Sequence, residues 1–162
     1  MNPRIPTLLA LLFSLTLAGC GFQLQGAVTV PADMQRTYVD GVDRYSPFYI
    51  ELSRNLDAAG VELVDTAADA TAVFSVLFDD TGQRVLSVST RNTPTEFEVY
   101  YTIEYALVSE DKSLLEQQDL TLTRDYTYDE TLVLGKSDEE ELLRRAIVDD
   151  LVRIVLRQIS TL

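Results

Sequence analysis

Histidine is missing from this sequence, and cysteine occurs once, at Cys20. Without histidine, the chain has no imidazole to activate a serine or cysteine nucleophile, and it lacks the ligand of the usual zinc sites. A single cysteine cannot form a disulfide within the chain, even in an oxidising compartment. Glycine-rich phosphate-binding loops are missing as well. These absences argue against the common nucleophilic, zinc-dependent and phosphate-loop enzymes.

Basic residues are scarce, since 13 lysines and arginines stand against 26 aspartates and glutamates, for a net charge of −13. Such an acidic domain repels nucleic acids and anionic lipid surfaces over its general field, so we expect no nucleic-acid partner. The carboxylates fit neither a calcium-binding loop nor a convincing catalytic pair, because most lie in expected turns or on solvated faces. The sequence predicts a binding protein rather than an enzyme, with no bound metal.

Only one long apolar run is present, at residues 5–17, and it follows a short lead that contains Arg4. The run is shorter than the about 20 residues that a membrane-spanning helix needs, and it lacks the polar face of a core helix. A charged lead, a short apolar segment and small residues at its end are typical of a secretory signal peptide. The ending Leu-Ala-Gly-Cys, residues 17–20, resembles the lipobox of bacterial lipoproteins.

The lipobox resemblance implies a processed and lipidated chain. We expect residues 1–19 to be a signal peptide that is removed, and Cys20 to carry a diacylglycerol and an N-acyl chain as its only additions, with no other cofactor. Residues 20–33 have two glycines and a proline but no clear period, which is typical of a tether. The remainder, residues 34–162, has the length of one domain with one core.

Local signals place two helices in this domain. The first is expected to start at Pro47 with Ser46 as its N-cap and to stop at Gly60. The second is expected to start with a capping box of Ser137 and Glu140. The expected strands are at 34–40, 72–89, 97–107 and 120–128, with a short strand or an extended segment at 61–64.

Period-two alternation assigns the faces of the long strands. Phe74, Val76 and Phe78 are expected on one face of the first long strand, and residues 79–82 fit either a hairpin turn or a bulge. The strand at 97–107 alternates apolar residues with carboxylates and other polar residues, which predicts one buried and one solvated face. The sequence therefore predicts an α+β two-layer sandwich, in which a mixed four-stranded sheet carries two helices packed on one face.

Two cations stand apart in this acidic chain. Arg91 lies at the tip of the turn at 91–94, and Lys136 lies just before the last expected helix. Most other basic residues lie on helices among acids, where paired surface charges contribute little. Exposed loop cations can hold an anionic head group or can be ordinary solvated charges, and these residues alone leave both readings open.

The start of the mature chain is similar to that of a known family. The heptapeptide Cys-Gly-Phe-Gln-Leu-Gln-Gly at 20–26 resembles the beginning of the LptE family of lipopolysaccharide-assembly lipoproteins. The expected order of elements agrees with that family over the whole mature chain. The resemblance implies that the first long strand is continuous, with Gly82 as a bulge. It also implies that Arg91 and Lys136 contact the phosphates of lipopolysaccharide.

The family resemblance also implies a function and a location. The expected partners are an LptD-like outer-membrane β-barrel, lipopolysaccharide, and the outer membrane through the lipid anchor. The chain would plug the barrel at the periplasmic face of the Gram-negative outer membrane, support barrel assembly and assist insertion of lipopolysaccharide into the outer leaflet. The alternative is a periplasmic envelope lipoprotein that activates a synthase of cell-wall polymers or weakly hydrolyses them.

Overall fold

The computed structural model describes residues 29–110, 112–128 and 133–162, and it describes their side chains except at 133–137. The expected signal peptide, Cys20 and most of the tether at 20–33 therefore lie outside the described residues. Within them, none of the helices is long and apolar enough to cross a membrane.

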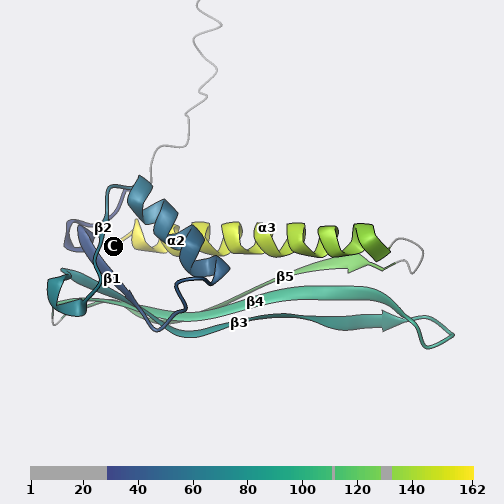
Figure 1. Cartoon of the computed structure of the whole chain (residues 1–162). Helices are drawn as coiled ribbons and strands as arrows, with labels where there is room; N and C mark the ends of the chain where they lie inside the picture. Colours follow the sequence, from purple (N-terminus) through teal and green to yellow (C-terminus); the bar gives the residue numbers. More distant parts are fainter. Residues whose placement is uncertain (1–28, 111, 129–132) are drawn as a thin grey trace, which may run out of the picture.

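The described chain forms two layers, with a five-stranded sheet below and two helices on one of its faces (Figure 1). The strand order is β2-β1-β3-β4-β5, in which β1 runs parallel to both neighbours and β3, β4 and β5 are antiparallel. The α+β class, the mixed sheet and the two helices on one face are confirmed. In chain order, the elements are η1 (Ala32–Met34), β1 (Arg36–Asp40), α2 (Pro47–Ala58), β2 (Glu62–Leu63), η2 (Ala67–Asp69), β3 (Ala72–Val88), β4 (Pro94–Ser109), β5 (Lys112–Thr127) and α3 (Val133–Ile159).

The expected count of four strands was wrong. The short segment at 61–64, which the sequence left between a strand and an extended segment, pairs with β1 through Arg36↔Glu62 and Thr37↔Leu63. This pairing is two residues long on each strand, and no period is visible over so short a segment.

Strand β3 is continuous, which excludes the hairpin turn at 79–82. A bulge lies between Val76 and Phe78, where pairing passes directly from Tyr105 to Glu104. Further register shifts lie between Val85 and Val88, and pairing is regular at Gly82. Side chains alternate between the two faces along a strand, so the extra residue moves every side chain after it to the face opposite the one that regular alternation predicts. Phe78 therefore shares a face with Glu104 and is 46% exposed, so its expected place beside Phe74 was wrong.

The first helix forms as its local signals predict. The Tyr49 N–H donates to the Ser46 side-chain oxygen at 3.1 Å, and Pro47 is the first helical residue. Gly60 ends the helix with φ of +84°, a conformation that glycine adopts without strain. The capping box predicted for the second helix was wrong, since α3 already begins at Val133. Serine is only mildly unfavourable inside a helix, so Ser137 does not prevent one more turn before it.

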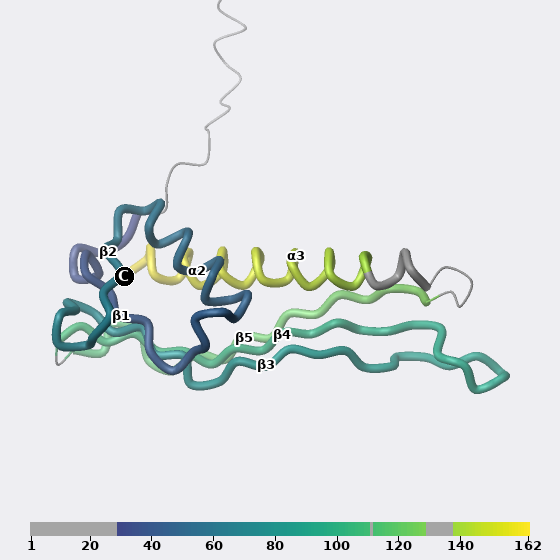
Figure 2. Tube along the Cα trace, viewed as in Figure 1, coloured from purple at the N-terminus to yellow at the C-terminus, as the bar shows by residue number. Residues whose placement is uncertain are grey.

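The core lies between the covered face of the sheet and the two helices (Figure 2). The predicted alternation of β4 is confirmed, because its apolar side chains from Val99 to Leu107 face the helices. The ring of Tyr105 stacks on Phe74 with the ring centroids 5.4 Å apart. The buried stripe of α3 consists of Ile147, Val148, Leu151, Val152, Val155, Leu156 and Ile159.

Candidate functional site

The turn between β3 and β4 lies at one end of the long axis, and the start of α3 lies at the same end (Figure 1). We call this the hairpin end, defined by residues 89–93 and the first turn of α3. In the turn, the Ser89 N–H donates to the Thr93 carbonyl at 2.7 Å, and the Asn92 N–H donates to the Ser89 carbonyl at 2.9 Å. Asn92 adopts a φ of +61°. These bonds hold Arg91 exposed at the tip.

Arg91 differs from most arginines of the described chain because its guanidinium forms no ion pair with any described residue. Eight arginines pair with carboxylates, among them Arg44 with Asp65 at 2.9 Å. Within the described part of the chain, Lys112 and Arg157 also lack an ion pair, and both lie toward the end opposite the hairpin. Sequence reasoning did not separate these two cations from the paired ones, because pairing depends on contacts between distant segments.

Lys136 lies in the first turn of α3, not before the helix as predicted. Its backbone is therefore at the hairpin end, as is that of Arg91. Its side chain lies outside the described residues.

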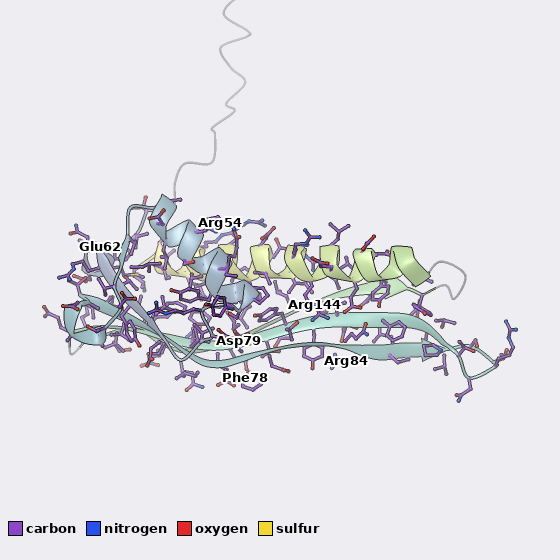
Figure 3. The ribbon with its side chains drawn as sticks, viewed as in Figure 1. Arg54, Glu62, Phe78, Asp79, Arg84 and Arg144 are labelled. Carbon is purple, nitrogen blue, oxygen red and sulfur yellow. The ribbon has the colours of Figure 1, made fainter. Side chains whose placement is uncertain are left out.

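Polar bridges connect α3 to the sheet, and one of them is formed by Arg144, which is labelled in Figure 3. Arg144 donates to the Thr81 hydroxyl at 2.6 Å and to Glu140 at 2.6 Å. Farther along the helix, Asp150 accepts from Arg124 of β5 at 2.6 Å. Sequence reasoning missed these bridges, since Arg144 and Thr81 are 63 residues apart.

Three tyrosines in the core, Tyr101, Tyr105 and Tyr126, have pKa values raised mainly by burial. Burial, and then the nearby Asp79 carboxylate, raises the pKa of Tyr101. Burial raises the pKa of Tyr105 from 10.0 to about 12, and its hydroxyl donates to the Gln158 side-chain oxygen. A buried phenol that is neutral and hydrogen-bonded at neutral pH is typical of structural packing.

The uncovered face of the sheet is lined by carboxylates, hydroxyls and Tyr100. Glu98 and Glu104 of β4 lie on this face, as the alternation predicted. Arg84 pairs with Glu98, and its guanidinium carbon lies 5.9 Å from the centre of the Tyr100 ring. Among the described residues, no three acidic, histidine or cysteine side chains come together in a way that could hold a metal ion.

A groove of about 480 Å³ lies between α2 and α3. Its charged side chains include the ion pairs Arg54–Glu51 and Arg145–Glu141, so much of its charge is neutralised internally. The lining residues are Pro47, Ile50, Glu51, Arg54, Glu141, Arg144, Arg145, Val148 and Asp149.

Together these features describe an α+β domain with one covered and one open sheet face, and with an arginine at its tip that forms no ion pair with a described residue. Comparison with known proteins agrees with this class. The family described as "LptE: Lipopolysaccharide-assembly" matches residues 34–159. The chain therefore belongs to the LptE family, whose members are non-enzymatic lipopolysaccharide-assembly lipoproteins of the Gram-negative envelope.

Individual relatives support the same assignment. The LPS-assembly lipoprotein LptE of Pectobacterium atrosepticum is 31% identical over 170 residues, covering 100% of this chain and 88% of its own length. The solution structure of an uncharacterized lipoprotein B from Nitrosomonas europaea superposes with a TM-score of 0.70 at 27% identity, covering 86% of this chain and 90% of its own. A minor lipoprotein from Acinetobacter baumannii superposes with a TM-score of 0.65 at 25% identity, covering 81% and 94% respectively.

Proposed function

We propose that this chain is the plug subunit of an outer-membrane lipopolysaccharide translocon and occupies the lumen of an LptD-like β-barrel. The observation that carries the proposal is the family match over residues 34–159, which spans nearly the whole two-layer domain. A water-filled barrel interior is polar, so its occupant needs a compact core and a polar exterior. The open sheet face, with its carboxylates and hydroxyls, supports that role.

The lipid anchor is proposed to be attached at Cys20 and to hold the domain at the periplasmic face of the outer membrane. Each buried methylene contributes about 0.8 kcal/mol, so several acyl chains together give stable attachment. Tethering also raises the effective concentration of the domain at the barrel without any new contact. In this position the chain would support barrel assembly and insertion of lipopolysaccharide into the outer leaflet.

Arg91 and Lys136 are proposed to contact the phosphates of lipopolysaccharide. The support for Arg91 is its exposure at the turn and the absence of an ion pair with any described residue. An unpaired guanidinium is free to form charge-assisted hydrogen bonds with a phosphate. The support for Lys136 is its backbone position at the same end.

Affinity isolation of the tagged, lipidated chain from solubilised membranes tests the plug. We expect one large β-barrel protein to co-purify at a fixed ratio and to remain bound through a second purification step. An unrelated outer-membrane lipoprotein with the same tag serves as the control. A clean preparation without any barrel would contradict the proposal.

The alternative function, activation or weak hydrolysis of cell-wall polymers, has less support. The family is a non-enzymatic assembly family, and its name places it in lipopolysaccharide assembly rather than in cell-wall synthesis.

A further inference from the structure

Strand β3 has a long edge that no described strand covers. One side of β3 pairs with β4 along almost its whole length, whereas the other side pairs with β1 only at residues 72–75. The loop after β1 closes this edge at Val76, because a Cβ on Gly41 would lie 2.1 Å from the Val76 carbonyl oxygen. Residues 77–88 form no backbone hydrogen bond to a described residue outside the sheet ladder. We call residues 77–88 the free edge (Figure 1).

The free edge also concentrates exposed apolar side chains. Five of its residues are between 46% and 55% exposed. An uncovered strand edge is a template for pairing with another chain, and proteins usually protect one with lysine, proline, a β-bulge or a covering segment. The register shifts of β3 lie at the two ends of this edge, between Val76 and Phe78 and between Val85 and Val88, and residues 78–85 pair regularly between them. No lysine or proline occurs at 77–88. Figure 3 shows Phe78 directed away from the helices. The exposed residues are Leu77, Phe78, Val85, Leu86 and Val88.

The free edge is acidic near its start, at Asp79 and Asp80. Arg84 is already paired with Glu98, and Asp79 lies on the covered face near Tyr101. Asp80 is exposed on the open face and forms no ion pair with a described residue. A segment that pairs with this edge would therefore carry a basic residue near Asp80 and apolar residues near Phe78 and Leu86.

We propose that the free edge binds an extended segment of the barrel partner by strand addition. This inference rests on the proposed function, and it names the surface through which the plug holds its barrel. Main-chain hydrogen bonds would supply the register, and the exposed apolar side chains of the edge would pack against those of the segment. The regularly paired stretch from Phe78 to Val85 extends roughly 26 Å, so the contact is long enough to define one register.

The occupant is a loop or terminal segment rather than a strand of the barrel wall. Strands in a closed barrel already pair on both sides and have no free edge to offer. A second copy of this chain fits less well. Antiparallel pairing centred near Gly82 would direct the 89–93 turn of one copy toward β1 of the other. Pairing centred on Arg84 would place two guanidiniums opposite each other.

Site-specific photo-cross-linking in the full-length lipidated chain tests this pairing. The cross-linking residue replaces Leu77, Leu86 or Val88 in separate variants, and Ile50 or Leu142 in controls that are exposed on α2 and α3 at 42% and 60%. The barrel is produced in the same cells. We expect the three β3 positions to cross-link to one contiguous barrel segment outside the barrel strands, with the spacing along that segment matching the spacing along β3.

A charge on the edge provides the second measurement. Leu86→Lys should reduce the yield of cross-linking from position 77 at least about fivefold, because an edge lysine opposes strand addition. Leu142→Lys, on the exposed side of α3, should leave that yield unchanged. The thermal midpoints of both variants establish that the fold is retained.

Three outcomes would overturn the inference. If the barrel co-purifies but the β3 positions cross-link to scattered sites on its lumen wall, the strand addition fails and the plug stands. If the β3 positions cross-link to a second copy of this chain, the named occupant is wrong. If no barrel co-purifies with any variant, both the plug and the pairing proposed here fail.

Discussion

Tyr105 connects the sheet to α3 through one hydroxyl in the core. Its ring is completely buried and stacks on Phe74, while its hydroxyl donates to Gln158 of α3. Burial disfavours the phenolate and raises the pKa of the side chain from 10.0 to about 12. Above pH 10 the folded state therefore binds more protons than the unfolded state, and stability falls as the pH rises toward 12.

The Tyr105→Phe variant separates the two effects of this hydroxyl. At pH 7 we expect a loss of about 1 kcal/mol in the free energy of unfolding, because the hydrogen bond to Gln158 is lost. Between pH 10 and pH 12, the variant should lose less stability than the parent by on the order of 2 kcal/mol, since it has no phenol to ionise. Urea denaturation at several pH values measures both the loss of stability at pH 7 and the loss between pH 10 and pH 12.

Tyr45→Phe is the control for this experiment, because Tyr45 is 86% exposed. It should leave the alkaline loss of stability as it is in the parent. An equal alkaline loss in the Tyr105→Phe variant would show that burial of Tyr105 does not contribute.

At the scale of elements, the junction of β1 and β3 depends on a glycine that leaves no room for a side chain. Gly41 has a φ of +78°, and a Cβ on it would lie 2.1 Å from the carbonyl oxygen of Val76. Gly60, at the end of α2, has a similar φ of +84° but nothing within 4 Å of the same position. The two residues share a backbone conformation and differ in their surroundings.

Alanine is therefore substituted at each glycine in turn. The difference between the two losses of stability measures the cost of the close approach between residue 41 and Val76. Gly60→Ala should destabilise the fold by about 1–2 kcal/mol, the cost of a left-handed conformation for an L-residue. Gly41→Ala should cost at least about 3 kcal/mol, because the backbone of β3 must also move. Denaturant midpoints measure both. Equal losses would contradict a tight β1–β3 junction.

Sequence reasoning predicted the elements whose signals are local and missed those that depend on pairing. Ser46, Pro47 and Gly60 define α2 within a few residues, and the alternation of β4 is visible directly. The bulge at Leu77 is different, because it is defined by how β3 pairs with β4. The bridge from Arg144 to Thr81 likewise joins residues 63 positions apart. For the same reason, the family resemblance gave the continuity of β3 but placed its bulge at Gly82.

At the scale of the whole molecule, unpaired cations occur toward both ends of the described chain. Arg91 lies at the hairpin end, with the backbone of Lys136, whereas Lys112 and Arg157 lie toward the opposite end. Only the first pair is proposed to contact lipopolysaccharide. The second pair therefore allows the same change of charge to be made away from the proposed site.

Arg91→Glu combined with Lys136→Glu should weaken lipopolysaccharide binding at least about tenfold, equivalent to about 1.4 kcal/mol, because phosphate contacts become repulsive. The control, Lys112→Glu combined with Arg157→Glu, changes the net charge equally and should alter binding far less. Binding to purified lipopolysaccharide is measured by titration, and circular dichroism verifies the fold. Equal losses in both double variants would indicate a general charge effect and contradict a site at the hairpin end.

The bulge at Leu77 also has a mechanical consequence. Roughly 36 Å of strand lies between Leu77 and Val88, so a bend of about 5° at the bulge displaces the far end of the strand by about 3 Å. The bend at the bulge therefore affects where the hairpin turn and Arg91 at its tip are placed. Insertion or removal of one residue at position 77 would redirect this cation without altering any residue of the turn that holds it.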